Sequence, residues 1–135
     1  MVTLWQRRLK GTGAWLRVAD ELTLAHGLKG LVIGLLGRGL RPRAVQAGIT
    51  TNDRFSGIYD LTDRVPYAAL FERFLAEISG AKNPLIMCHP AEVDDALRAA
   101  STFSTAREAE LRFLEGPDFL PMLARHGLTL GRLHA

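Results

Sequence analysis

The sequence predicts an α/β fold with a mostly parallel sheet and surrounding helices. Helical and short apolar segments alternate along its 135 residues, with helix, strand, helix, strand, helix, strand, helices and strand in order. Such alternation is typical of parallel sheets covered by helices. A hydrophobic content of 47% and a charged content of 23% exclude a disordered chain. One cysteine and no visible secretory segment exclude a disulfide framework and predict a cytoplasmic protein.

The N-terminal half is expected to alternate between helix and strand. Glycines stop the first helix at Gly11 and Gly13, and Gly48 ends the second. The second helix is expected to be either continuous or broken near Arg41-Pro42, because proline disfavours helix in the residue before it. The expected elements are a helix end over 2–10, a short buried strand over 14–19, a helix over 22–47, a loop over 51–53 and an extended segment over 55–60.

The C-terminal half begins with a well-marked helix. Asp63 is expected to cap it, Pro66 suits its first turn, and Gly80 ends it. Its apolar face is formed by Leu70, Phe71, Phe74, Leu75 and Ile78. The elements expected to follow are a strand over 85–88 covered on both sides, a short helix or turn over 92–100, a helix from a Thr105–Glu108 capping box to Leu114, a helix over 117–125 ended by Gly127, and a final strand over 128–133.

Candidate functional residues lie where the expected strands end. In parallel α/β folds, ligands bind beyond the carboxyl ends of the strands. This rule singles out Arg17, the Asn52-Asp53 loop with Asp60, and His89. These positions form the predicted site.

His89 has two interpretations from its position alone. It ends an apolar strand before Pro90, so it could transfer protons near neutral pH, or it could be a structural histidine bonded to the following turn. Cys88 is interpreted as a buried apolar filler, because adjacent strand residues point to opposite faces and cannot form a dyad. Asp94 and Asp95 have no established metal spacing after His89 and are interpreted as favourable charges near a helix start.

The charge is distributed unevenly along the chain. Residues 1–45 hold eight basic and two acidic side chains, a net charge of +6, whereas the whole chain has +3. This basic third is either a solvated face or the surface of a non-catalytic interaction module that binds a membrane surface or nucleic acid. The apolar piece 31–37 is far shorter than the ~20 residues that span a bilayer. No transmembrane segment and no nucleic-acid motif are therefore predicted.

Several stretches together resemble one family. The segments TNDRFSGIYDLTDRVPYAALFERFL, LIMCHPAEVDDAL and REAELRFLEGPDF, preceded by WLRVADE and LKGLVIGLLGRGL, are similar to the YdjC-like, or ChbG/HpnK, family of carbohydrate deacetylases. The resemblance covers nearly the whole chain but only the C-terminal half of the family. It implies an incomplete (β/α) barrel and hydrolysis of N-acetyl groups on sugars with a divalent metal, typically magnesium.

The family's metal ligands are a paired aspartate and two histidines, and this chain has none of those motifs. The resemblance therefore implies that residues 1–135 are a single incomplete domain, inactive alone. The expected explanations are a truncated or frameshifted gene, a mis-called start, or one half of a split enzyme. A half-barrel leaves apolar faces open, so the expected partners are the missing half or a second copy.

Four residues match family motifs. His89 matches the histidine of a His-Pro-Gly motif, and its implied role is to line the site as an acid for the leaving amine. Arg17, Asn52 and Asp53 match residues that line the sugar pocket. The family glycine after His-Pro is Ala91 here, which would be strained if that position needs a positive φ.

Overall fold

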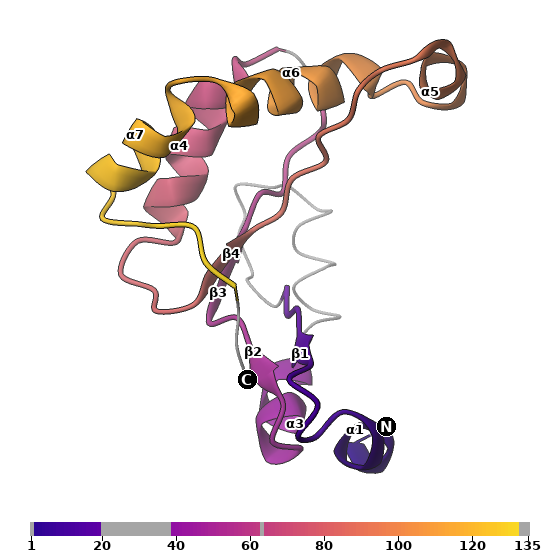
Figure 1. Cartoon of the computed structure of the whole chain (residues 1–135), viewed down its shortest axis with the longest axis vertical. Coiled ribbons are helices and arrows are strands. Elements are labelled where there is room, and N and C mark those ends of the chain that lie inside the picture. The colour runs from indigo at the N-terminus through magenta and orange to yellow at the C-terminus, as the bar shows by residue number, and fades with distance from the viewer. Residues whose placement is uncertain (1, 20–38, 63, 133–135) are drawn as a thin grey trace. The chain divides into compact units, whose positions relative to one another are not determined.

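The computed structural model describes residues 2–19, 39–62 and 64–132 and divides the chain into two compact units. The first unit contains Met1–Ser56, Gly80–Leu85 and Gly131–Ala135, and the second contains Gly57–Ser79 and Ile86–Leu130. Figure 1 traces the elements in chain order from α1 to α7. Each unit is described below by itself.

The first unit has short helices and a small parallel sheet. Strand β1 pairs with β2 in parallel, with Trp15 opposite Thr50 and Leu16 opposite Thr51. Its small core contains Ala44, Ala47 and Ile49, with Trp5, Leu9 and Leu16 packed against them. The elements are α1 (Val2–Arg8), β1 (Trp15–Leu16), α3 (Leu40–Gln46), β2 (Thr50–Thr51), β3 (Arg54–Ser56) and the start of β4 (Pro84–Ile86), and β3 and β4 form a second two-stranded sheet.

Two predictions for this unit are corrected. The strand over 14–19 is confirmed only at Trp15–Leu16, and it is not buried, since Trp15 is 39% exposed. Helix α3 begins at Leu40, after Gly39 adopts a left-handed conformation, so Pro42 lies in a first turn and interrupts no helix. A first turn tolerates proline because its N–H groups have no partner within the helix. The rest of the helix expected over 22–47 falls largely on residues outside the described ranges.

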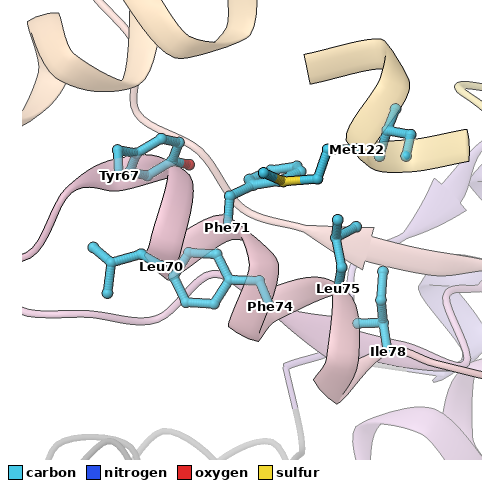
Figure 2. Packing of buried hydrophobic residues seen from close by; sticks show 8 residues of the cluster. Tyr67, Leu70, Phe71, Phe74, Leu75, Ile78 and Met122 are labelled. Atoms are coloured by element: carbon cyan, nitrogen blue, oxygen red, sulfur yellow. The ribbon is translucent and has the colours of Figure 1, made fainter. Parts of the chain in front are cut away.

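The second unit is helical and holds the main core. Helix α4 (Tyr67–Glu77) carries the predicted apolar face, and α7 (Phe119–Arg125) packs against it through Met122 and Leu123. Met122 reaches toward Phe71 in Figure 2. Helix α6 (Ser104–Glu115) adds Phe113, whose ring lies 5.2 Å from that of Phe71. Each buried side chain of this size contributes about 2 kcal/mol to stability, so this core makes the main hydrophobic contribution in the unit.

Several helix and strand ends in this unit differ from those predicted from the sequence. Helix α6 already begins at Ser104, so Thr105 lies inside it and the predicted capping box is wrong. Helix α4 begins after Pro66 rather than including it, and Asp63 lies outside the described residues. Strand β4 is half-buried rather than covered on both sides. Asp94 does cap α5 (Asp95–Ala100), because its side chain accepts a hydrogen bond from the Leu97 N–H.

The final strand predicted over 128–133 is wrong as far as Arg132, the last described residue. Gly127 adopts φ +66, and the Leu128 N–H donates to the Leu123 carbonyl oxygen. This is the hydrogen bonding of a helix end closed by a left-handed glycine, with Leu128 returning to the core. Leu128, an apolar residue that favoured the strand prediction, therefore closes the C-terminal end of α7.

The described strands form two two-stranded sheets and no closed barrel. The α/β class is confirmed, and the barrel-like arrangement stays a prediction. Within the described ranges, no helix combines the length and the apolar character needed to cross a membrane.

Candidate active site

The second unit contains one cluster of chemically active side chains around a buried carboxylate. We call it the Glu110 cluster, and its members are Tyr59, Tyr67, Cys88, His89 and Glu110. Glu110 lies in α6 one turn after Ala106, and both side chains are buried. Glu110 is fully buried, with none of its surface exposed. A buried carboxylate needs hydrogen-bond donors, because an isolated charge is strongly disfavoured away from water.

Among the described residues, two donors reach Glu110. The Tyr59 hydroxyl donates to Oε1 at 2.5 Å, and the backbone N–H of His89 donates to Oε2 at 2.5 Å. These distances are in the range of short hydrogen bonds to a charged acceptor. One bond to each oxygen fixes the plane of the carboxylate.

The imidazole of His89 faces the same carboxylate. Its Nδ1 lies 3.8 Å from Glu110 Oε1, beyond hydrogen-bond distance, and is buried without a hydrogen-bond partner in the described structure. The side chain as a whole is 28% exposed, so the exposure belongs to its other atoms. His89 therefore has one ring nitrogen toward a buried anion while another part of the ring reaches solvent.

The tyrosines of the cluster are proton donors. Burial raises the pKa of Tyr59, and the hydrogen bond to Glu110 raises it further. Burial also raises the pKa of Tyr67, which donates from its hydroxyl to Cys88 Sγ at 3.4 Å. Burial raises the pKa of the Cys88 thiol, although the bond from Tyr67 lowers it in part. Cys88 is consequently a thiol at neutral pH, and it packs against the core as a filler would, although it is half-buried rather than fully buried.

Asn52 lies in the first unit and is fully buried. Its Oδ1 accepts from the Val18 N–H at 2.8 Å, and its Nδ2 donates to the carbonyl oxygens of Val18 at 2.8 Å and Arg54 at 2.9 Å. The amide thus continues the pairing of β1 with β2 beyond Thr51, as a backbone peptide would. Its predicted contact with a sugar stays a prediction, and so does that of Arg17, which is exposed beside Val18.

Asp53 holds a turn in the same unit. Its carboxylate accepts from the backbone N–H groups of Lys82 at 2.8 Å and Asn83 at 3.0 Å. Burial alone would raise the pKa of Asp53, but these donors outweigh burial and lower it below its ordinary value of 3.8. Its role toward a ligand stays a prediction.

Asp53→Asn is expected to weaken the first unit at neutral pH. A lowered carboxylate pKa stabilises the folded state above the ordinary aspartate range, and this stability is lost as the pH falls through the lowered value. Urea unfolding followed by tryptophan fluorescence, at pH 7 and at pH 3, measures the change. The difference from the unmodified chain should shrink at the lower pH. An equal difference at both pH values would contradict the contribution of the charge.

His89 belongs to the second unit, and Arg17, Asn52 and Asp53 belong to the first. Ala91 has no positive φ, since Leu61 is the non-glycine residue with that conformation in the described ranges, so the expected strain is absent. In the part of the chain that the structure describes, no three His, Cys, Asp or Glu side chains gather to hold a metal ion.

Sequence reasoning missed Glu110 and Tyr59. The signal for Glu110 was its register, because Ala106, Glu110 and Phe113 follow the spacing of one helix face. A charged residue on an apolar face indicates a buried charge with a specific partner. Tyr59 had no comparable signal.

Comparisons with known proteins agree with one another. A family model described as "YdjC-like protein" matches residues 3–125. A carbohydrate deacetylase of Vibrio campbellii (strain ATCC BAA-1116) is 42% identical over 45 residues, which cover 33% of this chain and 18% of that protein. A carbohydrate deacetylase of Vibrio vulnificus (strain CMCP6) is 31% identical over 88 residues, which cover 62% of this chain and 35% of that protein. No solved structure matches the chain.

Proposed function

Because the chain belongs to the YdjC-like family, we propose that it is the C-terminal part of a carbohydrate deacetylase that hydrolyses N-acetyl groups on sugars. Two similar proteins named carbohydrate deacetylase support this function. The matched stretches cover only 18% and 35% of those proteins, so the remaining machinery is proposed to come from residues outside this chain. The chain alone is accordingly proposed to be inactive.

The observation that carries the proposal is the placement of His89 against Glu110. Amide hydrolysis adds water to the carbonyl carbon, breaks the C–N bond and leaves an amine that must gain a proton. An imidazole with one nitrogen toward a carboxylate and a part of its ring exposed is suited to give that proton. His89 is the proposed general acid, and the water supplies the oxygen of the acetate.

A divalent metal, typically magnesium, belongs to the proposal. The described residues contain no group that fits such an ion, so no step is assigned through it here. The residues proposed to line the sugar pocket are Arg17, Asn52 and Asp53, on the strength of the motif positions they match.

A chimera tests the function. In it, this chain replaces the aligned segment of the Vibrio vulnificus carbohydrate deacetylase. We expect the chimera to release acetate from N-acetylated sugars, and His89→Ala to lower kcat about a hundredfold, as loss of a general acid does. Acetate release is followed by a coupled assay, with the unmodified Vibrio protein as the reference.

His126→Ala is the matched control. His126 is also a partly buried histidine near a carboxylate, with Nε2 2.7 Å from Glu72 Oε1, but it lies at the end of α7 and outside the Glu110 cluster. Its loss should leave kcat within about twofold. A folded chimera that binds the sugar and releases no acetate, or full activity in His89→Ala, would count against the proposal.

A further inference from the structure

We propose that Glu110 is a positioning residue that holds the backbone of His89 and fixes which nitrogen of its neutral imidazole carries hydrogen. What the bound proton does in catalysis rests on the proposed function, but the pairing itself is a property of this chain. The hydrogen bonds and distances around this one buried carboxylate support the role.

Both oxygens of Glu110 are held by groups that cannot neutralise its charge. The Tyr59 hydroxyl and the His89 backbone N–H are neutral donors. A fully buried carboxylate held by neutral donors gains from a further N–H directed at it. The imidazole of His89 can supply one, with Nδ1 3.8 Å from Oε1.

The other ionisable groups around Glu110 do not take the place of the His89 imidazole. Tyr59 and Tyr67 have raised pKa values and remain neutral, and the Cys88 thiol does so too. Arg107 lies three residues before Glu110 on α6, and its Nε is buried without a hydrogen-bond partner. Arg107 is a cation that only donates hydrogen bonds, so it does not determine which nitrogen of His89 carries hydrogen.

The contact also determines which ring nitrogen carries hydrogen. A carboxylate only accepts, so an approaching Nδ1 must bear a proton in both the charged and the neutral ring. At 3.8 Å an Nδ1–H directs its positive end at the anion, whereas a bare Nδ1 lone pair would be repelled. Nε2 is then the nitrogen that loses and regains its proton. The neutral ring keeps Nδ1–H toward Glu110, so His89 gives up the Nε2 proton alone.

The test is ¹⁵N NMR of the histidine side chains in the 135-residue chain, which reports the tautomer of each neutral ring without any substrate. Glu110→Gln keeps the shape and removes the charge. We expect the ratio of Nδ1–H to Nε2–H in the neutral ring of His89 to fall about tenfold, because a neutral amide attracts an N–H less strongly than a carboxylate does. Glu108→Gln is the matched control, because Glu108 lies on the same helix but pairs with Arg112 at 2.8 Å.

Tyr59→Phe gives an independent reading if Glu110→Gln does not fold. It removes the donor to Oε1 and leaves that oxygen free to accept from Nδ1–H, so the preference of His89 for this tautomer should strengthen. Its matched control is Tyr67→Phe. The Tyr67 ring lies 6.0 Å from that of Tyr59, but its hydroxyl donates to Cys88 instead of Glu110. This control should leave the tautomer ratio of His89 within about twofold.

An unchanged His89 tautomer ratio in Tyr59→Phe and in folded Glu110→Gln would overturn the pairing. The outcome is separate from that of the chimera. A changed tautomer ratio without acetate release keeps the pairing and removes the deacetylase function. Acetate release with an unchanged tautomer ratio keeps the deacetylase function and removes the pairing.

Discussion

Gly57→Ala is expected to destabilise the second unit by about 3 kcal/mol or more. Gly57 adopts φ +99, a conformation that residues with a side chain rarely reach. A β-carbon there would lie 2.2 Å from the Met87 carbonyl oxygen and 2.7 Å from its backbone nitrogen. Neither atom can rotate away, so the two backbone segments must separate. The free energy of unfolding in urea, followed by far-ultraviolet circular dichroism, measures the loss.

Gly127→Ala measures the cost of a positive φ without the steric clash expected at Gly57. Gly127 also has a positive φ, of +66, but a β-carbon there would meet nothing within 4 Å. This variant should lose only the cost of the conformation, about 1–2 kcal/mol. If the two variants were equally stable, the close approach of Gly57 to Met87 would not exist in solution.

Asn52→Ala is expected to destabilise the first unit by about 3 kcal/mol or more. The substitution leaves the Val18 N–H, the Val18 carbonyl and the Arg54 carbonyl without the amide that now bonds them. Val18 is fully buried, so water does not readily replace these bonds. The midpoint of urea unfolding, read from tryptophan fluorescence, should fall. Trp5 and Trp15, the two tryptophans of the chain, both lie in this unit.

Asn83→Ala is the control for this change. Asn83 is an exposed asparagine of the same unit, and its backbone N–H donates to Asp53 whatever its side chain. The stability should change by less than about 0.5 kcal/mol. Equal losses in Asn52→Ala and Asn83→Ala would show that the amide of Asn52 does not hold β1.

Helices with a complete apolar face were predictable from the sequence. Helix α4 follows the spacing of Leu70, Phe71, Phe74 and Leu75, and all four side chains are buried. The physical reason is that an apolar helix face of this width is removed from water only when the helix packs it against the core. Helix starts were harder, because Thr105 has the residue type of a cap but lies one residue inside α6.

The candidate site was only partly predictable. His89 could be found from its position after an apolar run, but its partner Glu110 lies 21 residues further along the chain. Asn52 could be identified as a loop residue, whereas its bonds to Val18 span 34 residues. Residue types reveal which groups need partners. The partners themselves depend on how distant segments meet, which local patterns do not encode.

The half-buried Cys88 makes the chain its own reporter of the second unit. It is the single cysteine of the sequence, it packs against the main core, and its sulfur accepts from Tyr67. An alkylating reagent attacks the thiolate, which partial burial disfavours, so labelling should be slower in the folded chain than in an unfolded one. The ratio of the two labelling rates then measures how well the second unit protects the sulfur. Tryptophan fluorescence follows the first unit in the same sample, so the two units can be compared without introducing any probe.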